Sequence, residues 1–291
     1  MKKMTVAVKA TAVVLYLFVV AGIASSVSVL AADTPPVGNC FEAFSYAELI
    51  FADMQKFVRE EMAAADDDSE GEYSPEEAKA MFASLKRSEE RLDVLIAGLS
   101  GLTDDAATNE GKTVRATRDY LAMLKNMAHD MGELVAYGFE YYEAVMLMDK
   151  TSEDVNAEDI VDYDDWINAM HVYTSEVYTN SSRSLDALKK IKPPAYLAIT
   201  HGDVVKRVEE FRDFAVDFSN AATLGDPLRI YSCIYRMGRI TVTFGQCDAN
   251  MTSDIFLQLR QAERRLDGQI STLRAELSAY FALLNLKKGG D

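Results

Sequence analysis

Apolar residues recur along most of this chain at alternating spacings of three and four, which is the pattern of helices that pack along a seam. Stripes of this kind cover residues 78–99, 114–145, 160–191, 197–222 and 256–284. Short connections between long amphipathic helices favour antiparallel neighbours. We therefore expect an all-α fold, arranged as an elongated up-and-down antiparallel helical bundle.

Two further features refine this prediction. Residues 227–246, PLRIYSCIYRMGRITVTFGQ, include the β-branched run RITVTF, which favours a strand, but we interpret the whole segment as helix. The pair RLDVLIAGL and ATRDYLAML also resembles the later pair SLDALKKI and EEFRDFAVD. This weak self-similarity suggests that the bundle arose from a duplicated helical hairpin.

Composition agrees with long helices and a substantial core. Of 291 residues, 49% are hydrophobic, and there are only six prolines and fifteen glycines. The formal net charge is -16. Phosphate backbones and anionic lipid surfaces are poor partners for so acidic a chain, so we expect no binding to nucleic acid.

The N-terminus carries the clearest targeting signal. Three lysines within the first nine residues precede an uncharged, strongly apolar stretch over residues 10–32. Cleavage after its small residues would release a secreted, periplasmic or cell-surface protein, whereas the uncleaved stretch is long enough to anchor the chain in a membrane. The expected organisation is a leader or anchor over 1–32, a linker over 33–40, a helical bundle over 41–286 and a tail over 287–291.

An extracytoplasmic location bears on the three cysteines, Cys40, Cys233 and Cys247. In an oxidising compartment one disulfide and one free thiol are expected, although three reduced, buried thiols are the alternative. One helix holding Cys233 and Cys247 would separate them by about 21 Å, too far for a bridge, so Cys40 would pair with one of them. The absence of CxxC and Cys/His clusters excludes the usual zinc, redox and covalent-haem motifs.

Few residues indicate catalytic chemistry. His201 lies on an apolar stripe beside Thr200 and Asp203, where it suits either a ligand or proton-transfer group or, more commonly, a hydrogen-bonded packing residue. The aromatic and methionine residues of 139–148 could line a pocket for haem or another small ligand, or form bundle core. No nucleophile, base and orienting group converge in the sequence, so we do not expect an enzyme.

The most specific motif is the acidic segment over residues 66–77, DDDSEGEYSPEE. Its polar residues fall at loop positions 1, 3, 5, 7, 9 and 12, with Gly71 at position 6: Asp66, Asp68, Glu70, Glu72, Ser74 and Glu77. The segment resembles a single, imperfect EF-hand loop, whose calcium ion takes oxygen ligands at these positions and a glycine at the sharp turn. The resemblance implies one bound Ca²⁺.

The same residues also have an explanation without calcium. SPEE is by itself a capping box, with Ser74 as N-cap, Pro75 at the first helical position and Glu77 at the third. The preceding acids would then form a solvated loop near the positive end of a helix dipole. A calcium loop and a capped acidic turn both stay open.

These expectations combine into one functional hypothesis. We expect a non-enzymatic, extracytoplasmic binding or interaction protein, sensor-like or on the cell surface, stabilised by one calcium ion. Its architecture is broadly similar to prokaryotic extracytoplasmic four-helix-bundle ectodomains, a likeness without a specific motif. A bundle that binds haem or another small ligand is the alternative, followed by an enzyme of unknown type.

Overall fold

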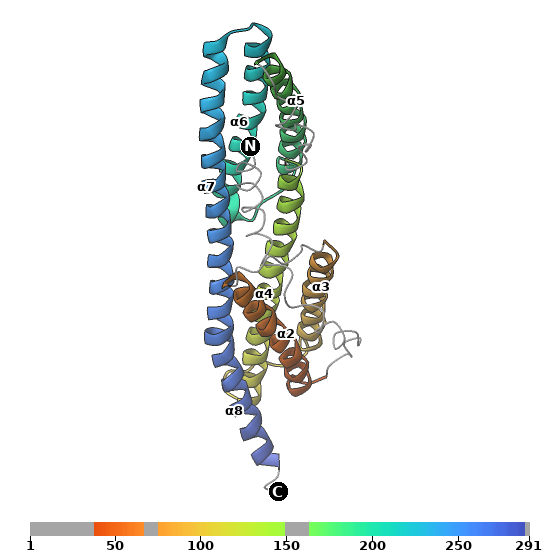
Figure 1. Cartoon of the computed structure of the whole chain (residues 1–291). Coiled ribbons are helices and arrows are strands. Elements are labelled where there is room, and N and C mark those ends of the chain that lie inside the picture. The colour runs from red at the N-terminus through yellow and green to blue at the C-terminus, as the bar shows by residue number, and fades with distance from the viewer. Residues whose placement is uncertain (1–37, 67–74, 149–162, 289–291) are drawn as a thin grey trace. The chain divides into compact units, whose positions relative to one another are not determined.

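The computed structural model of the chain describes residues 38–66, 75–148 and 163–288 (Figure 1). Its regular elements are helices that pack in an up-and-down bundle arrangement, which confirms the all-α prediction. In chain order they are α2 (Cys40–Asp66), α3 (Pro75–Gly98), α4 (Asn109–Met146), α5 (Tyr163–Leu188), the 3₁₀ turn η3 (Ala195–Leu197), α6 (Ala198–Thr223), α7 (Pro227–Arg265), the π-helical segment η4 (Leu266–Ile270) and α8 (Ser271–Lys288).

The described helices are not membrane spans: none combines the length and apolarity that crossing a bilayer requires. The predicted leader over 1–32 and most of the predicted linker lie outside the described residues. The signal or anchor therefore stays a prediction.

The helices form two compact units. Unit 1 comprises residues 137–255, which hold the end of α4, α5, α6 and most of α7. Unit 2 comprises residues 38–136 and 256–288, which hold α2, α3, most of α4, the end of α7, and α8. The bundle that the sequence predicts over 41–286 is thus built as two units.

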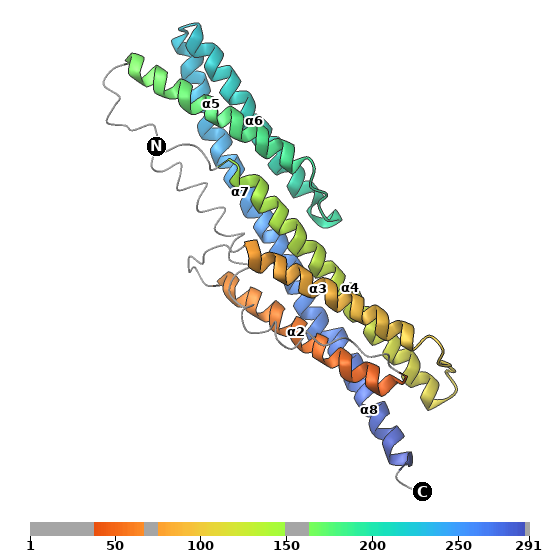
Figure 2. The same ribbon diagram turned by 90° about the vertical axis from the view of Figure 1, so that its right-hand side faces the viewer.

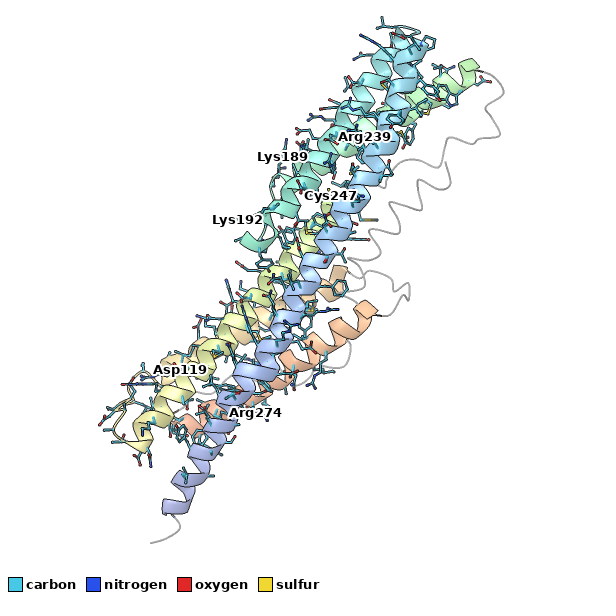
Figure 3. All side chains as sticks on the ribbon, turned by 90° about the vertical axis from the view of Figure 1, so that its left-hand side faces the viewer. Asp119, Lys189, Lys192, Arg239, Cys247 and Arg274 are labelled. Atoms are coloured by element: carbon cyan, nitrogen blue, oxygen red, sulfur yellow. The ribbon has the colours of Figure 1, made fainter. Side chains whose placement is uncertain are left out.

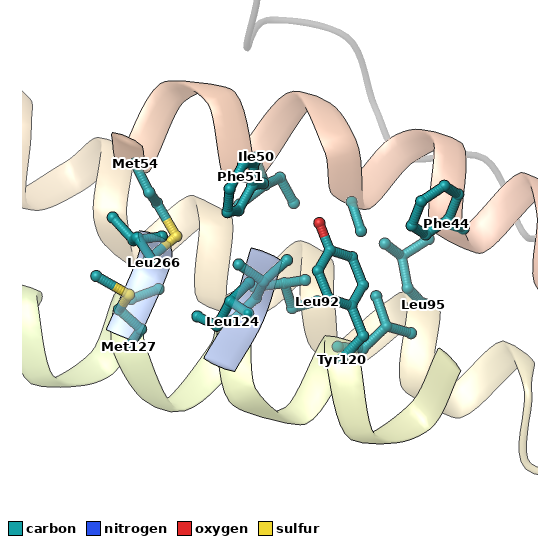
Figure 4. Packing of buried hydrophobic residues seen from close by; sticks show 14 of the residues in the cluster. Phe44, Ile50, Phe51, Met54, Leu92, Leu95, Tyr120, Leu124, Met127 and Leu266 are labelled. Carbon is teal, nitrogen blue, oxygen red and sulfur yellow. The ribbon is translucent and has the colours of Figure 1, made fainter. Parts of the chain in front are cut away.

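Unit 2 has an apolar core to which α2, α3, α4 and η4 all contribute (Figure 4). Phe44, Leu92, Leu124 and Leu266 are among its buried members. Tyr120 is also fully buried, and its hydroxyl donates a 2.8 Å hydrogen bond to Glu48 Oε1. The polar tip of this aromatic side chain is thereby satisfied inside an otherwise apolar contact.

The C-terminus of α3 is held by one side chain of α4. Arg118 donates hydrogen bonds from Nη2 to the carbonyl oxygens of Leu99 and Leu102, over 2.6 and 2.9 Å. Its Nη1 lies 3.5 Å from Asp104 Oδ2. The guanidinium therefore ties the turn that follows α3 to α4 through its backbone carbonyls.

In unit 1, α5 and α6 run side by side in both views (Figure 1 and Figure 2). The turn from α6 to α7 follows from Gly225, whose φ of 60° suits a residue without a Cβ. The N–H of Asp226 donates to the carbonyl of Ala221 over 3.1 Å, which closes a Schellman turn. The Asp226 carboxylate then caps α7 by accepting from the N–H groups of Leu228 and Arg229.

The strand-like segment over 227–246 is helical, as interpreted from the sequence, and belongs to α7. Its apolar residues Ile230, Ile240 and Phe244 recur at helical spacing and are buried in unit 1. Burial of this face offsets the weak preference of β-branched residues for strands, because tertiary packing outweighs local propensity.

Candidate functional site

The predicted calcium ligands fall at the edge of the described residues. Asp66 is the last residue of α2, and Glu77 lies in the first turn of α3, which begins at Pro75 as the capping box predicts. The other predicted ligands lie outside the described residues: Asp68, Glu70, Glu72 and Ser74. Among the described residues no three His, Cys, Asp or Glu side chains are grouped to hold a metal ion. The calcium site stays a prediction.

The structure places a buried polar cluster in unit 1, centred on Asp248 of α7. Asp248 is only 2% exposed, and Tyr141, near the end of α4, donates a 3.2 Å hydrogen bond to its Oδ1. The other carboxylate oxygen, Oδ2, is buried and has no hydrogen-bond partner among the described residues. The same holds for Oγ1 of Thr252, one turn further along α7. Buried polar groups are rarely left unpaired, because desolvation without a new hydrogen bond is costly.

Burial also changes the acidity of this carboxyl group. Desolvation raises the pKa of Asp248 from 3.8 to about 7, and the hydrogen bond from Tyr141 offsets a smaller part of that rise. Near neutral pH the group therefore exchanges between its neutral and ionised forms. A carboxyl group that titrates in this range inside a protein is typical of functional sites.

A second buried pair lies beside the first. His201 of α6 has Nε2 3.2 Å from the carbonyl oxygen of Leu188 and Nδ1 3.1 Å from the hydroxyl of Tyr137. A carbonyl only accepts, so Nε2 carries the proton and Nδ1 accepts from the tyrosine. Desolvation lowers the pKa of His201, which keeps the ring neutral. His201 is thus a hydrogen-bonded packing residue.

Two stacked tyrosines connect the Tyr141–Asp248 pair to the Tyr137–His201 pair. The rings of Tyr137 and Tyr141 lie 5.8 Å apart at an interplanar angle of 26°, and both side chains are buried. The Tyr137 hydroxyl also lies 3.5 Å from Sδ of Met251. Tyr141, a member of the aromatic run that starts at residue 139, therefore belongs to the bundle interior, and its hydroxyl is directed to Asp248.

The cysteines make no covalent link in this structure. Cys40, Cys233 and Cys247 are all free thiols, and Cys247 is labelled on α7 in Figure 3. Cys233 and Cys247 share the unbroken α7, which rules out a bridge between them as the sequence indicated. The predicted pairing of Cys40 with one of them is not formed, and the structure has the alternative, three reduced thiols.

Sequence reasoning missed Asp248 for an identifiable reason. Phe244, Asp248 and Met251 follow one another at spacings of four and three, so the carboxylate occupies a position on the buried stripe of α7. An acidic residue on an apolar stripe is the signal that could have found it. The mixed strand and helix character of the preceding segment hid that stripe.

Comparison with known proteins found no relative of this chain. No family model matches the chain, and no curated protein or solved structure matches it. Functional proposals therefore rest on the chain's own residues.

Proposed function

We propose that this chain is a non-enzymatic binding protein that acts outside the cytoplasm, as a sensor-like or cell-surface module, and that its unit 1 binds a small hydrogen-bond donor beside Asp248. One observation carries the proposal: Oδ2 of Asp248 is buried without a hydrogen-bond partner among the described residues. A bound hydroxyl or ammonium group would supply that partner. Spaces between bundle helices are common places for such ligands.

The acidity of Asp248 indicates how the ligand's charge would matter. An ammonium group favours the ionised carboxylate, so its binding would lower the pKa of Asp248 and release a proton. Such a ligand binds more tightly above pH 7 than below it. A neutral alcohol can accept from the protonated acid or donate to the carboxylate, so its affinity changes less with pH.

The other proposals for this chain have less support from the geometry. Haem ligation through either ring nitrogen of His201 would break the hydrogen bond that this nitrogen makes, to the Tyr137 hydroxyl or to the carbonyl of Leu188. The same two bonds occupy both ring nitrogens, which disfavours His201 as a general base in an enzyme. Export through the leader over 1–32 and calcium binding by the loop over 66–77 remain part of the proposal on sequence grounds.

A thermal-shift screen tests the proposed ligand class. Small primary amines and small alcohols, added one at a time, are expected to raise the melting temperature of the wild-type protein. The isosteric variant Asp248→Asn should lose the response to amines. Asp213→Asn, which changes an exposed carboxylate that pairs with Arg212 in the same unit, should keep it. An unchanged response in Asp248→Asn, or no response of the wild type to any compound, would contradict the proposal.

A further inference from the structure

The N-terminal part of α7 exposes an apolar stripe to solvent, which we call the outer face. Its four large residues are strongly exposed: Leu228 by 84%, Tyr231 by 76%, Tyr235 by 73% and Val242 by 63%. Three small residues lie between and after them on the same face: Gly238, Gly245 and Ala249. Exposed large apolar groups in one continuous stripe mark an interaction site more often than scattered ones do.

The spacing of this stripe is that of a coiled-coil seam. The seven residues follow one another at intervals of three, four, three, four, three and four, which spans about 32 Å of helix. The core-facing residues of the same helix, including Ile230, Ile240 and Phe244, are buried within unit 1. At 100° per residue the two sets lie on opposite sides of α7. The outer face is therefore a second seam that the core of unit 1 does not use.

The three largest residues come first along this seam, and small residues predominate after them. Leu228, Tyr231 and Tyr235 come first, whereas Gly245 and Ala249 come last. A Cβ atom added at Gly238 or Gly245 would meet nothing within 4 Å, so the fold of the chain does not require a glycine at either position. Glycine is also a poor residue for a helix interior. A partner side chain that approaches the backbone closely would explain both glycines.

We propose that the outer face binds the outer face of a second copy of this chain, with the two α7 helices antiparallel about a two-fold axis beside Ile240. In this register Tyr231 lies against Ala249 of the partner subunit, and Tyr235 against the partner's Gly245. Val242 lies against the partner's Gly238. Each of these three layers joins a large residue to a small one, and the two-fold axis repeats each layer with the roles exchanged.

Self-complementarity identifies the occupant of the face. An isologous interface must match its own surface reversed, and the order of sizes from Tyr231 to Ala249 meets that condition. The charges nearby are mostly compensated within the chain, since Arg229 pairs with Asp226 and Arg236 with Asp217. Arg239, which Figure 3 labels on α7, is next to Ile240 in the sequence, so the proposed register brings two copies of it together across the dimer.

Sedimentation velocity of the purified full chain over a range of concentrations tests the dimer. Gly245→Leu should weaken self-association by more than about tenfold, because the leucine fills the recess for Tyr235. The variant should still fold, since leucine favours helix and a Cβ atom at this position meets nothing within 4 Å. Combining Tyr235→Gly with Gly245→Tyr exchanges the two sizes and should restore the dimer. A wild type that stays monomeric, or a Gly245→Leu variant that associates normally, would overturn the proposal.

The register has its own tests. Arg239→Cys should form a disulfide-linked dimer, whereas Ser232→Cys should not, because the antiparallel register separates its two copies by about 24 Å along the axis. Arg239→Gln, or a rise from about 0.1 M to about 1 M salt, should tighten the dimer by removing or screening repulsion between like charges. Equal cross-linking at both positions, or a dimer weakened by either change, would show that this antiparallel register is wrong.

Discussion

Tyr141 and Asp248 lie 107 residues apart in the chain, yet the hydroxyl of one donates a 3.2 Å hydrogen bond to the buried carboxylate of the other. This bond joins the end of α4 to α7 inside unit 1. Only one of the two carboxylate oxygens is satisfied in this way among the described residues. The stability of the unit should therefore depend on the protonation of Asp248.

We expect the free energy of unfolding to contain a contribution from Asp248 that falls as the pH rises from about 4 to 7. The pKa of this group is about 7 in the folded protein and near 3.8 when it is exposed. Between these values the folded state binds more protons than the unfolded state, so rising pH favours unfolding. The cost of ionising the buried Asp248 is absent below pH 3.8 and complete above about pH 7. Its full size is on the order of 4 kcal/mol.

Urea denaturation of the wild type and of Asp248→Asn from pH 4 to pH 8 measures this contribution. The asparagine imitates the neutral acid, so the variant should be the more stable protein at pH 8 and should lack that part of the pH dependence. Asp213→Asn serves as the exposed control and should follow the wild type. Parallel curves for the wild type and Asp248→Asn would refute the prediction.

Tyr141→Phe should shift the same pH dependence to higher pH. The hydrogen bond from Tyr141 lowers the pKa of Asp248, so its loss leaves desolvation unopposed and raises that pKa further. Leaving a second buried oxygen unpaired should also cost about 1 to 3 kcal/mol at neutral pH. Tyr178→Phe, on an exposed tyrosine of α5, should change neither quantity. An unmoved pH midpoint would argue against the bond.

Arg118→Met should destabilise unit 2 by about 1.5 to 3 kcal/mol, because it removes charge-assisted hydrogen bonds to the carbonyls of Leu99 and Leu102. Arg118→Lys should recover only part of this loss, since an ammonium cannot reproduce the planar fork. Arg260→Met, on an exposed arginine of the same unit, is the matched control. Denaturation midpoints that agree for all three variants would contradict this role of Arg118.

Calcium should raise the melting temperature if the loop over 66–77 is an EF-hand-like site, with dissociation at about 10⁻⁴ to 10⁻³ M and a weaker effect of magnesium. Asp66→Ala should abolish the calcium response without affecting the Ser74 cap. Ser74→Ala should cost about 1 kcal/mol with or without calcium. Calorimetric titration of the metal-stripped wild type and of both variants measures the calcium affinity. No binding heat and no thermal shift at about 10 mM calcium would leave a capped acidic turn.

Expression in a prokaryotic host should place the protein outside the cytoplasm. Its N-terminus should then lie near Ala32 if the leader is cleaved, or the intact chain should remain in the membrane fraction if residues 10–32 serve as an anchor. N-terminal sequencing of the fractionated protein distinguishes these outcomes. A soluble cytoplasmic product that retains Met1 would contradict both.

The helices were predictable because their signals are local. The stripe over 114–145 lies within α4, and the capping box that ends at Glu77 places the start of α3 at Pro75. Hydrophobic spacing and capping act between residues three or four positions apart, so the order of residues is enough to reveal them. The acidic loop is equally local, which is why it could be proposed from sequence.

The polar cluster depended on long-range packing instead. Sequence order indicated that the segment over 227–246 is helical, but not that Asp248 would meet Tyr141 or that His201 would accept from Tyr137. Which side chains share a core depends on how whole helices stack, and burial then sets the pKa values of Asp248 and His201 in opposite directions. The tertiary structure decided the candidate site, because desolvation exists only once the helices have packed.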